Sequence, residues 1–235
     1  MTMPFYVSPE QVMQDKAEYA RKGIGRGKPS VTLEYDTGML LMAENPSTLS
    51  KIGEIYDRIA FAGVGKFSEF DQLRKLGVRY ADTRGYAYSR DDVRAKALAN
   101  AYSQAMGEVF TRELKPLEVE VIVAEVGDDT LAGHEQNAIY RVQFDGSISD
   151  HEGFCVIGGA AEELGSLLRS EYRTGLPLRD ALRLGHRALQ RAADREPNVT
   201  ADNLEVCLLE RHRVGRKFRR LHTDTLREML STQGT

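Results

Sequence analysis

The order of the predicted elements constrains the fold of this chain more than any single motif does. Helical periodicity covers residues 9–22, 66–83, 91–114, 160–173, 178–193 and 223–230. Strand-like runs are SVTLEY, MLLMAEN, IGEIYD, IAFAGVG, VEVIVAEVG, AIYRVQFDG, GFCVIGG, LEVCLLE and the edge KFRRL. Groups of strands therefore alternate with pairs of helices, which is not the order of a doubly wound sheet. We expect an α+β fold: a four-layer αββα sandwich of two antiparallel sheets between helix pairs, with an extra N-terminal helix.

Composition narrows the class of protein. The chain has 235 residues, 41% hydrophobic and 29% charged, so we expect one domain spanning 1–235. A formal charge of −3 gives little support for nucleic-acid binding, and the basic run RHRVGRKFRR reads as a solvated edge strand and turn. No apolar segment approaches the ~20 residues of a membrane span, and the N-terminus lacks a signal-peptide pattern. We therefore expect no membrane partner and a cytoplasmic location.

The stretch GIGRGKPS, residues 23–30, has some features of a phosphate-binding loop. That loop needs a glycine five positions before its Gly-Lys pair and a hydroxyl after the lysine, but Lys22 and Pro29 stand there. We interpret the stretch as the end of the helix over 9–22, in which Gly23, Gly25 and Gly27 supply a left-handed turn.

The helix over 9–22 opens on a good capping sequence. We place Ser8 at the N-cap and Pro9 at the first helical position, with Gln11 able to bond back. Its narrow apolar stripe, which indicates a helix lying on a neighbour, consists of Val12, Met13, Ala17 and Ala20. The longer stripe of the 91–114 helix indicates packing lengthwise on a sheet and consists of Val93, Ala97, Ala101, Ala105, Met106, Val109 and Phe110.

Catalytic and metal-binding residue types form no recognisable constellation. Cys155 and Cys207 each sit in an apolar strand-like run, where a thiol acts as a small buried hydrophobe. The five histidines never fall at a metal-ligand spacing, and no serine has a Gly-x-Ser-x-Gly setting. We therefore expect no metal site and no cofactor.

Several segments, in their order and spacing, resemble one known family over nearly the whole chain. They are SPEQVMQDKAEYARKG, SVTLEYDTGMLLMAEN, STLSKIGEIYDRIAFAGVGK, ADTRGYAY, the DGSI turn and the CVIGG strand. The family is the α-type subunits of the proteasome core particle, most closely those of actinobacterial type. The resemblance implies the αββα sandwich of the N-terminal-nucleophile hydrolases, packed in a heptameric ring.

The resemblance also implies that this chain is noncatalytic. In the catalytic β subunits a threonine opens the mature chain at the start of the first strand, and its own amine serves as the base. Lys28 and Pro29 stand at that place here, so we expect no catalytic residue. Thr2 would become N-terminal if Met1 were removed, but it precedes the strand by too many residues to hold a catalytic geometry.

Two other readings stay open on the residues alone. The first is an independent N-terminal-nucleophile amidohydrolase, which would need a nucleophile at the first strand. The second is a binding module unrelated to proteolysis. Only the resemblance argues against the second reading.

Three groups of site residues are implied by the resemblance. An axial gate is carried by the tail, residues 1–8, and the start of the helix: Thr2, Met3, Pro4, Phe5, Tyr6, Val7, Ser8 and Pro9. Activator docking falls to Lys51 and Gly27, which match residues of a pocket between adjacent α subunits. The turn of Lys115, Pro116, Leu117 and Glu118 matches the rim of the channel, and the sandwich itself would span 30–235.

The implied partners follow from the same family. They are further α subunits in the ring, proteasome β subunits and a ring-shaped ATPase activator. Unfolded protein substrates, with or without a Pup tag, would pass through in transit.

Overall fold

The computed structural model describes residues 8–131, 133–191 and 199–231 of the chain. Two five-stranded antiparallel sheets form its centre, with strand orders β10-β9-β2-β1-β8 and β3-β4-β5-β6-β7. The strands of the first sheet are β1 (Ser30–Tyr35), β2 (Gly38–Glu44), β8 (Phe154–Ile157), β9 (Leu204–Glu210) and β10 (Phe218–Arg220). Those of the second are β3 (Ile52–Tyr56), β4 (Ile59–Gly65), β5 (Val119–Glu125), β6 (Ala138–Val142) and β7 (Ile148–His151).

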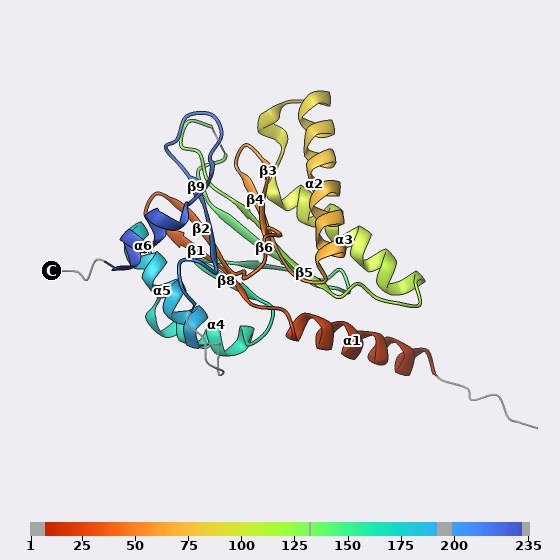
Figure 1. Ribbon diagram of the computed structural model, residues 1–235. Helices are drawn as coiled ribbons and strands as arrows, with labels where there is room; N and C mark the ends of the chain where they lie inside the picture. The colour runs from red at the N-terminus through yellow and green to blue at the C-terminus, as the bar shows by residue number, and fades with distance from the viewer. Residues whose placement is uncertain (1–7, 132, 192–198, 232–235) are drawn as a thin grey trace, which may run out of the picture.

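Helices cover both outer faces of the sheets. The second sheet packs against α2 (Phe67–Ala87) and α3 (Ala95–Arg112), and the first against α4 (Ala161–Glu171) and α5 (Leu178–Arg191). The short α6 (Thr223–Ser231) packs on α5, while α1 (Pro9–Gly25) lies across one end of the sandwich, beside β4 and β5 (Figure 1). The predicted four-layer sandwich with an extra N-terminal helix is confirmed.

Alternation along the strands builds the layers. In β2, Leu40 and Met42 join the cluster beneath α4 and α5, whereas Met39, Leu41 and Ala43 join the core between the two sheets. Successive side chains of a strand point to opposite faces, so one apolar strand serves two cores. Cys155 and Cys207 lie in the core between the sheets, as expected for buried thiols.

The start of α1 matches the predicted cap, and its buried face matches the predicted stripe in part. The backbone N–H of Gln11 donates to the Ser8 hydroxyl at 3.2 Å, and Pro9 begins the helix. The side chain of Gln11 does not bond back, because its amide donates to Asp15 Oδ1 at 2.7 Å. Of the predicted stripe, Ala20 is buried and Ala17 packs beside it, whereas Val12 and Met13 are exposed. The second buried residue of the helix, Ile24, lies beyond the predicted end.

None of the three glycines at the end of α1 forms the predicted left-handed turn, and two of them have close neighbours. The helix runs on to Gly25 and ends at Arg26 with a right-handed backbone, and none of Gly23, Gly25 and Gly27 has a positive φ. A Cβ on Gly27 would lie 2.6 Å from Val64 Cγ1, and one on Gly23 would lie 2.3 Å from Glu118 Oε2. The predicted left-handed turn is therefore wrong. The glycine at 27 is explained by the closeness of Val64 and of the backbone at Ile24 and Gly65, whereas the neighbour of Gly23 is the mobile end of a side chain.

The start and buried face of α3 differ from the prediction, and one strand was not predicted. Helix α3 begins at Ala95 and not at 91, after a short 3-10 turn over Arg90–Asp92. The residues it buries are Ala95, Leu98, Ala99, Tyr102 and Met106, so the predicted stripe was rotated from the true one. Strand β7, with the sequence ISDH at the sheet edge, carries no apolar alternation and was not predicted.

A buried carboxylate fixes the start of α3 against the sheet. Glu125, at the end of β5, accepts from Arg58 Nη1 at 3.1 Å, Arg94 Nε at 2.9 Å and the backbone N–H of Ala95 at 2.8 Å. The side chain of Glu125 is 2% exposed and that of Arg58 is 7% exposed. This carboxylate therefore joins β5, the β3–β4 turn and α3.

Replacing Glu125 by Gln should destabilise the fold by about 3–5 kcal/mol, because it leaves the buried Arg58 without its counter-charge. Urea unfolding of the isolated chain measures the loss. Glu108→Gln is the matched control, since it removes an exposed pair with Arg112 and should hardly change the midpoint. Equal midpoints for the two variants would contradict a structural role for Glu125.

Candidate functional site

The end of the sandwich where β1 begins brings Lys51 against the connection between α1 and β1. Helix α1 leads through Gly27, Lys28 and Pro29 into β1, and Lys51 directly precedes β3. The Lys51 Nζ atom donates to two backbone carbonyls, that of Lys28 at 3.1 Å and that of Glu44 at 2.9 Å. Lys51 therefore contacts the residue that follows Gly27 in the chain.

Two carboxylates border Lys51 without forming an ion pair with its amine. The Glu44 carboxylate lies 2.8 Å from Lys28 Nζ. The Glu205 carboxylate accepts from the backbone N–H of Lys51 at 2.9 Å and of Ile52 at 3.1 Å, and it also pairs with Arg220. Burial lowers the pKa of Lys51 to about 8, although the charges of Glu44 and Glu205 act in the opposite direction.

This geometry suits the capture of one carboxylate. An ammonium has three N–H donors, and the described residues take up two of those of Lys51. The third can donate to an incoming anion in a partly desolvated setting, where charge-assisted hydrogen bonds are strong. The charged groups that act on this amine are Lys28, Glu44 and Glu205, and sequence reasoning assigned none of them to the site.

Gly27 helps to shape the same end through its backbone. Its carbonyl accepts from the N–H of Gly159 at 3.1 Å, which joins the α1–β1 connection to the chain just after β8. Because Val64 closes on its Cα, a side chain at this position would push β4 away. The glycine therefore allows the connection to lie close to both sheets.

The start of β1 offers no nucleophile. Ser30 is fully buried, and its hydroxyl donates to the Met42 carbonyl at 3.0 Å. Helix α1 and a short connection precede Ser30 in the chain. The amine of Ser30 is therefore part of a peptide bond and cannot serve as the base of an N-terminal nucleophile. Burial raises the pKa values of the Cys155 and Cys207 thiols to about 12, which keeps both as unreactive thiols.

The predicted rim turn is held tightly against α1 and α2. Lys115 Nζ lies 3.0 Å from Glu69 and 2.9 Å from Glu118, and these two carboxylates raise its pKa. The Tyr19 hydroxyl donates to Glu118 Oε1 at 3.3 Å. Pro116 is buried and Leu117 packs on the core beneath α2 and α3, so the charged residues Lys115 and Glu118 form the outer part of the turn.

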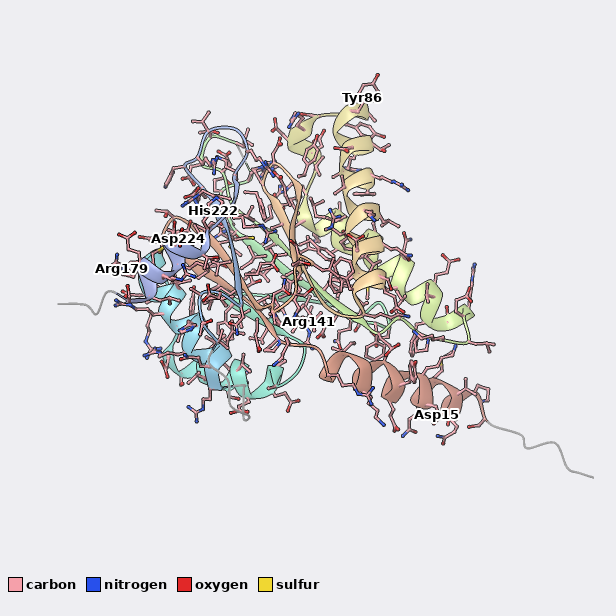
Figure 2. All side chains as sticks on the ribbon, viewed as in Figure 1. Asp15, Tyr86, Arg141, Arg179, His222 and Asp224 are labelled. Carbon is pink, nitrogen blue, oxygen red and sulfur yellow. The ribbon has the colours of Figure 1, made fainter. Side chains whose placement is uncertain are left out.

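The gate residues are described only in part. Thr2, Met3, Pro4, Phe5, Tyr6 and Val7 lie outside the described residues. Ser8 and Pro9 begin α1, at the end of that helix farthest from the sheets. Asp15 of α1 and Tyr86 of α2 mark opposite ends of the molecule (Figure 2).

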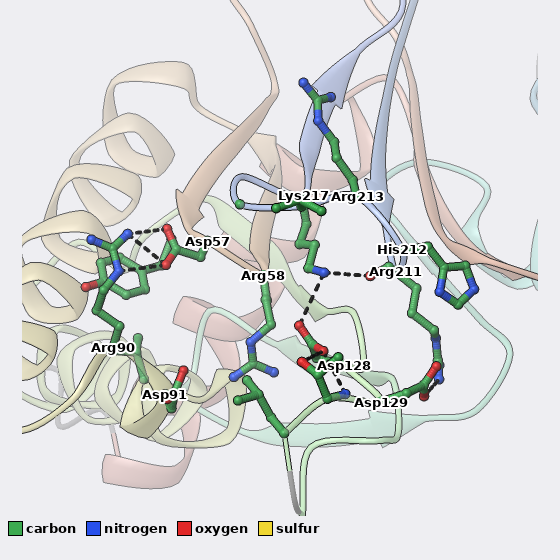
Figure 3. Close-up of a pocket in the computed structure, with 16 residues that line it drawn as sticks. Asp57, Arg58, Arg90, Asp91, Asp128, Asp129, Arg211, His212, Arg213 and Lys217 are labelled. Atoms are coloured by element: carbon green, nitrogen blue, oxygen red, sulfur yellow. Dashed lines mark hydrogen bonds and ion pairs between the residues drawn. The ribbon is translucent and has the colours of Figure 1, made fainter.

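The opposite end of the sandwich holds a polar cavity of about 480 Å³ (Figure 3). Three pairs of oppositely charged side chains lie in its lining: Arg90 bonds Asp57, Lys217 lies 3.2 Å from Asp128, and Arg211 lies 2.8 Å from Asp129. Several side chains of the basic run are thus paired with carboxylates around the edge strand β10, in agreement with the edge-strand prediction. Within the described residues, no group of His, Cys, Asp and Glu could hold a metal ion, and no helix is long and apolar enough to cross a membrane.

Known proteins give a consistent picture. A family model described as "Proteasome subunit" matches residues 24–209. The chain is 55% identical to "Proteasome subunit alpha" of Xylanimonas cellulosilytica, with 94% of this chain and 93% of that protein covered. It is 51% identical to "Proteasome subunit alpha" of Thermobifida fusca (98% and 91% covered) and 51% identical to that of Frankia alni (100% and 99% covered).

The amine of Lys51 should titrate near pH 8, whereas an ordinary lysine titrates near 10.5. Because the folded value is the lower one, the unfolded chain binds more protons between these pH values, and stability should rise with pH across that window. NMR titration of 13C-labelled lysine measures the pKa, and Lys51→Arg assigns the signal. A Lys51 signal that titrates above pH 10 would show that burial does not perturb this amine.

Proposed function

This chain belongs to the proteasome subunit family as an α-type member, and we propose that it forms, gates and equips the outer ring of a proteasome core rather than catalysing hydrolysis. The observation that carries the proposal is the entry of the chain into β1 from α1, which leaves no terminal amine at that strand, while the hydroxyl of its first residue, Ser30, is bonded to the Met42 carbonyl. Proteolysis then belongs to separate β subunits. The alternative of an independent N-terminal-nucleophile amidohydrolase would need a nucleophile with a free amine at the start of β1, where α1 precedes the strand.

The proposed partners follow from that role. α subunits assemble in a heptameric outer ring that stacks on proteasome β subunits in the cytoplasm. A ring-shaped ATPase docks on the outer face and feeds unfolded proteins, with or without a Pup tag, into the chamber. The turn of residues 115–118 lines the way in.

Docking is proposed to rest on Lys51. The third N–H of its ammonium meets the C-terminal carboxylate of an activator tail in a groove between neighbouring α subunits, and the backbone at Gly27 forms part of the wall. A hydrogen bond to a charged group contributes about 1.5–3 kcal/mol. Several tails engaged at once turn such contacts into stable docking.

Lys51→Ala should weaken activator binding sharply, and Lys51→Glu should weaken it further because it repels the incoming carboxylate. Wild-type binding should itself decline as the pH rises above about 8, where the ammonium is lost. The measurement is activator-stimulated degradation of an unfolded protein beside basal hydrolysis of a short peptide. Lys75→Glu, on the exposed side of α2, is the charge-matched control and should leave stimulation intact. Undiminished stimulation in Lys51→Glu would place the docking pocket elsewhere.

Deleting residues 1–7 should speed the entry of short peptides if these residues cover the axial pore. Peptide hydrolysis by assembled particles measures the entry rate. A control variant carries a tail of the same length made only of Gly and Ser. It shows whether peptide entry is slowed by the bulk of the native side chains or by the length of the tail. Equal rates for the full-length and truncated particles would remove the gating role.

A further inference from the structure

The amine of Lys51 keeps a fixed orientation in both of its protonation states. Its Nζ donates to the carbonyls of Lys28 and Glu44, at 3.1 and 2.9 Å. A neutral amine has two N–H donors and one lone pair, so both hydrogen bonds survive the loss of a proton. The lone pair then takes a remaining tetrahedral direction, away from the two carbonyls, where the third N–H of the ammonium would otherwise point.

The charges that face Lys51 are mostly engaged with other groups. Glu44 of β2 pairs with Lys28, and Glu205 of β9 pairs with Arg220 of β10 and accepts from two backbone N–H groups. No carboxylate of the described residues forms an ion pair with Lys51 Nζ. Burial and the charge of Lys28 favour the neutral amine, and the more distant charges of Glu44 and Glu205 oppose them only in part.

Lys115 provides the internal contrast. Its ammonium lies within 3.0 Å of both Glu69 and Glu118, and these carboxylates raise its pKa. The surroundings of these two lysines therefore shift their pKa values in opposite directions. Only the neutral amine is a nucleophile, so the two should differ widely in reactivity.

We propose that Lys51 is a site of acylation by small acyl phosphates, and that its acylation turns activator docking off. The lone pair of Nζ attacks the carbonyl carbon of the acyl phosphate, and a C–N bond forms. The C–O bond to phosphate breaks, inorganic phosphate leaves with the electron pair, and one amine proton passes to solvent. The product is an Nε-acyl lysine, and no oxidant or reductant is needed.

Acylation would remove what docking requires. The amide nitrogen keeps a single N–H, so it can no longer serve both carbonyls and an incoming carboxylate. The positive charge is also lost. This regulatory consequence rests on the proposed docking role of Lys51, whereas the reactivity of the amine does not.

Site-resolved acetylation of the assembled α ring tests the reactivity. The ring is treated with acetyl phosphate between pH 6.5 and 9, and peptide mass spectrometry gives initial rates for Lys51, Lys75 and Lys115. At pH 7.5 roughly a quarter of Lys51 should be neutral against about a thousandth of an ordinary lysine. Weaker intrinsic nucleophilicity offsets part of this gain, so we expect Lys51 to react about tenfold faster than Lys75. Its rate should level off above about pH 8, and Lys115 should be the slowest of the three.

Lys28→Gln tests the cause while leaving Lys51 in place. Removing this cation takes away a positive charge and frees the Glu44 carboxylate, so the amine should become more basic. Acetylation of Lys51 at pH 7.5 should then slow severalfold, with Lys75 unchanged. Acetylation of Lys51 no faster than that of Lys75 in the wild-type ring would overturn the proposal.

Activator binding by acetylated rings separates this inference from the docking role. Loss of binding in proportion to acetylation of Lys51, and in Lys51→Gln, supports the switch. Fast acetylation with full binding would overturn both the switch and the docking role, while the reactive amine would stand. Slow acetylation combined with loss of docking in Lys51→Ala would overturn this inference alone.

Discussion

The passage of the backbone from α1 into β1 is the constraint on which the rest of this end of the molecule depends. Gly27 must lie against Val64, and its carbonyl must meet the N–H of Gly159, for the chain to enter the sheet between its neighbours. Ser30 is then fully buried, with its hydroxyl spent on Met42. The same path that excludes a terminal nucleophile carries the Lys28 carbonyl to Lys51. The path of the backbone from α1 into β1 thus accounts for both the lack of an N-terminal nucleophile and the proposed docking site.

Paired charges hold the ends of the strands. Glu125 joins Arg58 and Arg94 at one end of β5, and near its other end Glu120 meets Arg141 at 2.5 Å. Buried carboxylates of this kind are costly unless they are fully paired, so each one fixes the elements that supply its partners. Lys51 differs from these paired groups, because its amine donates to two backbone carbonyls and to no carboxylate of the described residues. One N–H donor of its ammonium is therefore available to a ligand.

Local patterns predicted the layers well because alternation and helical period are properties of short segments. SVTLEY and MLLMAEN became β1 and β2, and Ser8 caps α1 as its sequence indicated. The failures depended on distant residues. The buried stripe of α3 faces β5 and β6. Gly27, after α1, lies against Val64 of β4, and Gly23, near the end of α1, lies against Glu118. Glu205 lies 154 residues from Lys51, so no local signal could place that carboxylate beside the site.

The account depends on hydrolysis being the work of a different chain. The measurement is peptide hydrolysis by the purified full-length chain alone and after assembly with a β subunit, each with and without Thr2→Ala. We predict no turnover by the chain alone, and activity in the assembled particle that Thr2→Ala leaves unchanged. Loss of turnover on Thr2→Ala in a correctly assembled particle would contradict the noncatalytic role of this subunit.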